Sequence, residues 1–229
     1  MLYPNRCPIC EEILAPKDKL IHNRCRKQLV FIEEPKCLRC GKPIEQEEVE
    51  YCFDCKKRSF HYLHGYPCIK YDKNMSKSIS AFKFKGKKEY AQFYIDEILN
   101  MYEMQFRRAK FDVVIPIPIH ASRYKERGFN QAELIAEGIS KRIQVPIDTN
   151  VLVRTRKTLP QKELDEKERL RNLQKAFELA KNIQTKYERI LLVDDIYTTG
   201  STIEACANLL VQSGVTEVCY TSVCIGHGY

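Results

Sequence analysis

Residues 189–202 read RILLVDDIYTTGST, and this stretch carries the local signals that decide the fold. The apolar residues 190–193 predict a short strand buried on both faces. Beyond the polar residues that follow, apolar side chains recur at helical spacing and stop at Gly214, a residue type that commonly ends helices. These helical positions are Ile203, Cys206, Ala207 and Leu210. A strand, a polar loop and a helix are therefore predicted in direct succession.

The same order of elements occurs elsewhere in the chain. An apolar run at 112–118 predicts a second buried strand, and residues 130–143 have apolar positions on one helical face. Residues 88–107 predict another amphipathic helix, residues 62–72 look extended, and residues 216–225 predict a further strand. This alternation indicates an α/β fold with a doubly wound, mostly parallel sheet. Ligands of such sheets bind at the carboxyl ends of the strands, which places candidate sites in the loops after 118 and after 193.

Residues 194–202 have the chemistry of a cradle for a phosphorylated sugar. Gly200 permits a left-handed turn, and the free amides at the start of the next helix point at one anion. Asp194 and Asp195 would accept hydrogen bonds from sugar hydroxyls and help hold a hydrated magnesium ion. A turn capped by a single Asp or Thr is the ordinary alternative, but nine consecutive residues fit the cradle. The hydroxyl groups that would donate to the phosphate belong to Thr198, Thr199, Ser201 and Thr202.

Two basic segments accompany this loop. Arg123, Lys125 and Arg127 place three cations within five residues after the 112–118 strand. Solvated charge is the usual role of such a run, but its position on the ligand side of the sheet also favours contact with a pyrophosphate. Several lysines lie between 73 and 88, where a solvated face is expected.

The chain has eleven cysteines, and eight of them precede residue 69. Ligand-like pairs separated by two residues occur four times, and two such pairs supply the four ligands of a tetrahedral zinc ion. Disulfides require an oxidising compartment, and a redox C-x-x-C pair would not be repeated four times, so we predict two structural zinc ions. The pairs are Cys7 with Cys10, His22 with Cys25, Cys37 with Cys40, and Cys52 with Cys55.

Sequential pairing gives one site from the first two pairs and a second site from the last two. The spacing leaves open a cross-braced pairing, and it leaves open whether His22 is a ligand or an ordinary surface histidine. We expect a zinc-binding module at 1–60 and an α/β domain at 61–229. The module is too small to build a core alone, so zinc would supply most of its folding free energy.

Composition sets further bounds. Hydrophobic residues make up 44% of the chain and charged residues 30%, which suits a packed globular core. The formal net charge of +8 permits binding of phosphates or nucleic acid without choosing between them. The sequence has no apolar run of membrane-spanning length and no signal-like segment near its start, so we expect a cytoplasmic protein without membrane insertion.

The 189–202 stretch resembles the signature of the type I phosphoribosyltransferases, in which an apolar strand, two acidic residues and a T-G-[SG]-[ST] loop bind phosphoribosyl pyrophosphate (PRPP). Three further features extend the resemblance over nearly the whole chain: the paired cysteines, IPIP at 115–118, and RYKERGFNQ at 123–131. With them, the sequence looks like the ComF family, which is associated with DNA uptake in naturally competent bacteria.

The resemblance implies a type I phosphoribosyltransferase fold with a small N-terminal double zinc-ribbon module. It implies that Asp194 and Asp195 are catalytic carboxylates, and that residues 198–202 bind Mg-PRPP together with Arg123 and Arg127. Purine-salvage relatives have an aspartate at the position of Thr198, so a purine acceptor is not implied. Residues that fall in the mobile active-site hood of such proteins are Arg154, Thr158, Gln161, Arg169 and Asn172.

Three functions are open on this basis. The first is a PRPP-dependent transferase with an unknown acceptor, and the second is a non-catalytic sensor of PRPP or phosphorylated ribose. The third is favoured by the family's role: a competence factor that handles incoming single-stranded DNA with a helicase partner and retains the PRPP site. The basic segments at 73–88 and 123–127 motivate the third function.

Overall fold

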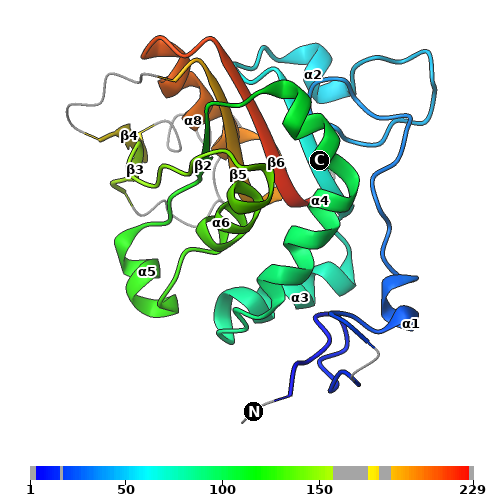
Figure 1. Cartoon of the computed structure of the whole chain (residues 1–229). Helices are drawn as coiled ribbons and strands as arrows, with labels where there is room; N and C mark the ends of the chain where they lie inside the picture. The colour runs from blue at the N-terminus through cyan, green and yellow to red at the C-terminus, as the bar shows by residue number, and fades with distance from the viewer. Residues whose placement is uncertain (1–3, 16–17, 157–174, 181–186, 227–229) are drawn as a thin grey trace.

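The computed structural model describes residues 4–15, 18–156, 175–180 and 187–226 (Figure 1). A four-stranded sheet of order β1-β6-β5-β2 lies at the centre of these residues, and each strand is parallel to its neighbours. The predicted α/β fold with a parallel sheet is confirmed. The strands are β1 (His64–Lys70), β2 (Val113–Pro116), β5 (Arg189–Tyr197) and β6 (Glu217–Ile225).

Helices cover both faces of the sheet (Figure 1). One face packs against α3 (Lys73–Phe84), α4 (Tyr90–Ala109) and α6 (Gln131–Ile143), and the other packs against α8 (Ser201–Gln212). Side chains of a strand alternate between faces, so Leu191 and Val193 join the first core while Ile190 and Leu192 join the second. The sheet is therefore doubly wound, as predicted.

Smaller elements complete the described part. Helix α5 (Ala121–Arg127) follows β2, and the strands β3 (Leu152–Arg154) and β4 (Phe177–Leu179) form an antiparallel pair. The short helices α1 (Asn23–Arg26) and α2 (Phe53–Lys57) belong to the cysteine-rich region.

Two local expectations differ from the structure. Strand β5 does not stop at Val193 but continues to Tyr197, because residues 194–197 keep pairing with β6. The lysine-rich stretch also forms α3, which we did not predict. This helix begins where the Asp72 side chain accepts a hydrogen bond of 2.8 Å from the Met75 amide, and it buries Met75, Ile79 and Phe82.

The cysteine-rich region packs on both faces of the sheet. Cys7 and Cys25 join the core on the α4 face, whereas Cys37, Cys40 and Cys55 join the core on the α8 face. The chain passes from one face to the other along β1, where Ile32 N donates to Cys68 O at 3.0 Å and Lys70 N donates to Val30 O at 2.8 Å. Residues 30–32 thus cover the outer edge of the sheet. The expected boundary after residue 60 falls between α2 and β1.

Close packing between α4 and α6 gives a test of the fold. A Cβ atom at Gly138 would collide with the side chain of Ile95, chiefly with its Cδ1 atom. We expect Gly138→Ala to lower the free energy of unfolding by about 1–3 kcal/mol in urea denaturation, although alanine favours helices. Combining it with Ile95→Val removes Cδ1, the atom closest to the added Cβ, and should recover part of the loss. Strict additivity of the two changes would contradict this account.

Candidate metal clusters and an anion-binding cleft

Two clusters of ligand atoms have the composition of zinc sites. In each cluster the four ligand atoms all lie within 4.8 Å of one another. Pairing is sequential, and His22 belongs to the first cluster with its Nδ1 atom 3.3 Å from Cys10 Sγ. Thiolate sulfur and imidazole nitrogen are the ligands of structural zinc, so both clusters are consistent with two structural zinc ions. The clusters are Cys7/Cys10/His22/Cys25 and Cys37/Cys40/Cys52/Cys55.

The two carboxylates at the end of β5 have different surroundings. Asp195 is 8% exposed, and its two oxygens lie 2.8 and 2.7 Å from Lys83 Nζ of α3. Asp194 is partly exposed and accepts a 2.8 Å hydrogen bond from the Asp195 amide. Although the residue keeps some exposed surface, the protein around its carboxylate displaces water, and this desolvation, followed by the neighbouring Asp195 charge, raises the pKa of Asp194 to about 7, while Lys83 and Arg154 oppose this rise. A ligand that supplies hydrogen-bond donors or positive charge would therefore stabilise the ionised form of Asp194.

The loop after β5 begins α8 without a side-chain cap. Gly200 takes the N-cap position with a φ of 78°, which is the left-handed conformation that the sequence predicted. The side chains of Asp72, His120 and Asn130 cap α3, α5 and α6, whereas α1, α2 and α4 resemble α8 in having no side-chain cap. An uncapped helix start leaves backbone amides for an anion. Thr198 is exposed, Thr199 and Thr202 are partly exposed, and Ser201 is buried with its Oγ 2.9 Å from Thr199 Oγ1.

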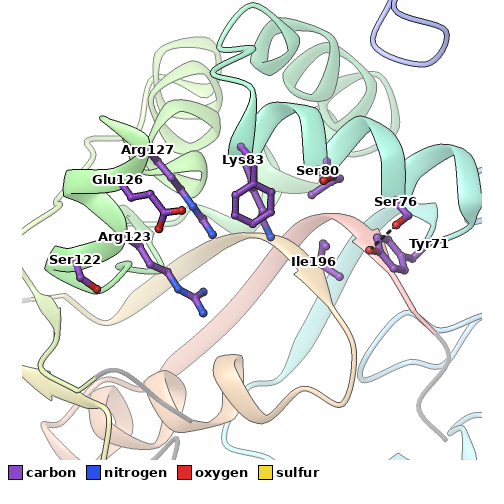
Figure 2. A pocket seen from close by; sticks show the side chains of 11 residues that line it. Tyr71, Ser76, Ser80, Lys83, Ser122, Arg123, Glu126, Arg127 and Ile196 are labelled. Carbon is purple, nitrogen blue, oxygen red and sulfur yellow. Dashed lines mark hydrogen bonds between the residues drawn. The ribbon is translucent and has the colours of Figure 1, made fainter. Parts of the chain in front are cut away.

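A cleft of about 760 Å³ opens at the carboxyl edge of the sheet, between α3, α5 and the end of β5 (Figure 2). Three cations line it: Lys83 from α3, and Arg123 and Arg127 from α5. Ile196 is its lining residue from β5, so the cleft borders the strand that carries both carboxylates. The predicted phosphate loop, 198–202, lies outside this lining. Hydroxyl groups in the lining belong to Tyr71, Ser76, Ser80 and Ser122.

Like charges are concentrated at this edge of the sheet. Arg123, Arg127 and Arg154 lie close enough that the charge of Arg123 lowers the pKa of both other side chains, after burial, which is the largest cause for each. Arg127 Nη1 donates to Gln131 Oε1 at 2.8 Å, but its buried Nε has no partner among the described residues. Such a grouping is stabilised when an anion binds between the guanidinium groups.

Sequence reasoning expected Arg123 and Arg127 after the 112–118 strand, and both line the cleft at the carboxyl edge of the sheet, but it did not single out Lys83. This lysine was one of several in a stretch expected to be solvated, and only the helical spacing of the buried residues Met75, Ile79 and Phe82 before it indicated an ordered position. Arg154 of the expected hood lies in β3. The other expected hood residues, Thr158, Gln161, Arg169 and Asn172, lie outside the described residues.

Buried tyrosines connect the second cluster to the loop after β5. Tyr220 Oη donates to the carbonyl oxygen of Cys40 at 2.8 Å, and its ring stacks on Tyr197 with the centroids 4.8 Å apart. The Tyr197 hydroxyl lies 2.7 Å from that of Tyr62 and so close under Gly200 that any Cβ there would collide with it. This packing keeps glycine at the start of α8.

These features define a class of protein: a parallel α/β sheet with a double zinc ribbon on its two faces and a cationic cleft at its carboxyl edge. Residues 1–56 match the family model of the double zinc ribbon domain. Over 223 residues the chain is 32% identical to Competence protein F of Haemophilus influenzae, and the match covers 93% of each chain. The chain therefore belongs to the ComF family.

Other relatives agree with this assignment. Competence protein ComFC of Bacillus subtilis is 29% identical over 88% of this chain and 82% of its own. DNA utilization protein YhgH of Escherichia coli K12 is 28% identical over 96% of this chain and 97% of its own. Purine phosphoribosyltransferase from Pyrococcus horikoshii superposes loosely, with a TM-score of 0.37 and 15% identity over 58% of this chain and 83% of that one. Within the described residues, every helix is too short or too polar to cross a membrane.

Metal content tests the clusters. We expect two zinc equivalents per chain by metal analysis, and one equivalent after Cys40→Ser, with a lower thermal unfolding temperature because the second ribbon shares the α8 core. Cys219→Ser, at a buried cysteine outside both clusters, should keep two equivalents. A folded wild-type chain free of zinc would contradict the assignment.

Asp194 gives a pH test. Its pKa is about 7 in the folded protein and about 4 when unfolded, so between these values the folded state holds a proton that the unfolded state releases. Asp194 should therefore contribute a fall in the free energy of unfolding as the pH rises between these values, by at most about 1.4 kcal/mol per pH unit. In urea denaturation, Asp194→Asn should lose this contribution, so the pH dependence of its unfolding free energy should differ from that of the wild type, whereas Asp96→Asn on α4 should match the wild type. The same pH dependence in Asp194→Asn as in the wild type would refute the assignment to this group.

Proposed function

We propose that the chain binds Mg-PRPP, or a closely similar phosphorylated ribose, at the carboxyl edge of the sheet, and that it handles single-stranded DNA during DNA uptake. The observation that carries the proposal is the grouping of three arginines with two carboxylates at the end of β5. Neither set of charges alone would select such a ligand.

The mixture of charges selects a ligand with two kinds of groups. Arg123, Arg127 and Arg154 favour a polyanion such as a pyrophosphate. Asp194 and Asp195 repel a bare polyanion, but they accept hydrogen bonds from sugar hydroxyls and favour a divalent cation. A sugar polyphosphate carried with magnesium satisfies both sets.

Asp194 is the carboxylate better placed for the sugar and the hydrated ion, because both oxygens of Asp195 are paired with Lys83. Bound magnesium would supply positive charge that offsets the charge of the pyrophosphate. Residues 198–202 would hold the 5′-phosphate, since the Gly200 turn leaves the amides at the start of α8 uncapped. Arg123 and Arg127 would then face the pyrophosphate from α5.

The role in DNA uptake is supported by the relatives, which are named competence proteins and DNA utilization proteins. A net charge of +8 and the cationic cleft suit a nucleic-acid ligand. A helicase that delivers the strand is the partner that this role implies.

Titration calorimetry with magnesium and PRPP tests the ligand. The wild-type chain should bind with one site per chain, and Asp194→Asn/Asp195→Asn should lose at least about 100-fold in affinity, because two charged hydrogen-bond acceptors are removed. Asp96→Asn is the control and should bind like the wild type. Circular dichroism confirms folding of each variant. Unchanged affinity in the double variant, or no binding by the folded wild type, would refute the proposal.

A further inference from the structure

Among the apolar side chains of the cleft, which suit neither a phosphate nor a sugar, one is largely exposed. Phe84, the last residue of α3, lines the cleft and is 62% exposed. Isolated exposed apolar side chains are common on protein surfaces, so exposure alone means little. Here the phenyl ring lies among the cations Lys83, Arg123 and Arg127 and the hydroxyl groups of the lining. It offers a flat apolar surface in a lining that also contains the acidic Glu126 and the aliphatic Ile79 and Ile196.

Arg127 links this ring to the anion-binding groups. Its guanidinium carbon lies 4.8 Å from the centroid of the Phe84 ring, while its buried Nε has no hydrogen-bond partner among the described residues. Burial and the charge of Arg123 both lower the pKa of Arg127. The same guanidinium can therefore contact a phosphate while the ring beside it stays open for stacking.

Proteins that bind single strands combine these two elements, an aromatic ring on which a base stacks and cations that follow the backbone. We propose that Phe84 is a stacking platform for a nucleobase of single-stranded DNA at the mouth of the cleft, and that Arg127 and Arg123 contact the adjoining phosphates. This inference rests on the DNA-handling part of the proposed function and assigns it a residue and a place.

The surroundings favour a polymer over a free nucleotide. Further exposed lysines lie on the segments that carry the cleft residues, Lys88 shortly after α3 and Lys125 on α5, although exposed Glu89 and Glu126 are next to them in sequence. Tyr124, which is 50% exposed, lies on the same short helix as Arg123 and Arg127. A strand several nucleotides long has more phosphates and bases to contact these groups than a single nucleotide has.

The chain has no tryptophan, so a tryptophan placed at position 84 becomes a unique fluorescent reporter. In Phe84→Trp, an oligothymidylate of about 12 nucleotides should quench the fluorescence in a saturable way that weakens with added salt. In Phe84→Ala, affinity for the same oligomer measured by anisotropy should fall by about 5- to 100-fold. Thymidine monophosphate at equal base concentration should quench far less than the oligomer.

Phe53 provides a matched control. It is 68% exposed on α2, and Lys57 Nζ lies 4.0 Å from its ring centroid, so it has the same ring and a similar cation but lies outside the cleft. Phe53→Trp should show no quenching, and Phe53→Ala should bind the oligomer like the wild type. Both changes replace exposed side chains, and circular dichroism should confirm that every variant folds.

The outcomes separate this inference from the proposed function. Oligomer binding equal to wild type in Phe84→Ala, or equal quenching at positions 84 and 53, overturns the stacking platform and leaves DNA handling in place. Equal quenching by the monophosphate assigns the ring to a free nucleotide and also overturns the inference. If folded wild type binds no oligomer, both the inference and the DNA-handling proposal fail.

Discussion

The candidate site depends on the position of β5 between two parallel partners. Pairing with β2 on one side and β6 on the other fixes its direction and depth, so its carboxyl end opens at the same edge as the loops that lead to α3 and α5. Because the pairing with β6 continues to Tyr197, Asp194 and Asp195 are held in a strand and alternate between its faces. Asp195 is thereby available to Lys83 of α3, while Asp194 lies where the charge of Arg154 acts on it.

The double zinc ribbon is part of this arrangement rather than an appendage. Arg26 of the first ribbon makes two hydrogen bonds of 2.9 Å with the buried Glu97 of α4. On the opposite face, the amide and ring nitrogen of His61, which directly follows the second ribbon, contact Glu204 in the first turn of α8 at 2.8 and 2.5 Å. With the tyrosine contacts under Gly200, these interactions tie the start of α8 to the metal-binding region. A metal cluster distant in sequence thus helps to position the loop after β5 and the start of α8.

Much of this architecture could be predicted from local patterns, because strands, helices and C-x-x-C pairs each leave a short periodic signature. The end of β5 could not, since its apolar run stops at Asp194 and the further pairing depends on β6. Which pairs share a zinc ion could not be predicted either, because the spacing identifies the pairs but does not show which two pairs lie close together in the folded chain. Lys83 was missed for the same reason: its partner, Asp195, is distant in the chain and reaches it only once the sheet is wound.

Residues 30–32, which cover the outer edge of the sheet, matter for the metal-free chain. They form hydrogen bonds with backbone groups of β1 that would otherwise face solvent, and a metal cluster lies on each side of them in the sequence. A bare outer strand is a template for pairing with other molecules. Loss of zinc would therefore expose this outer strand while it also weakens both cores, so self-association between chains should accompany the loss of stability.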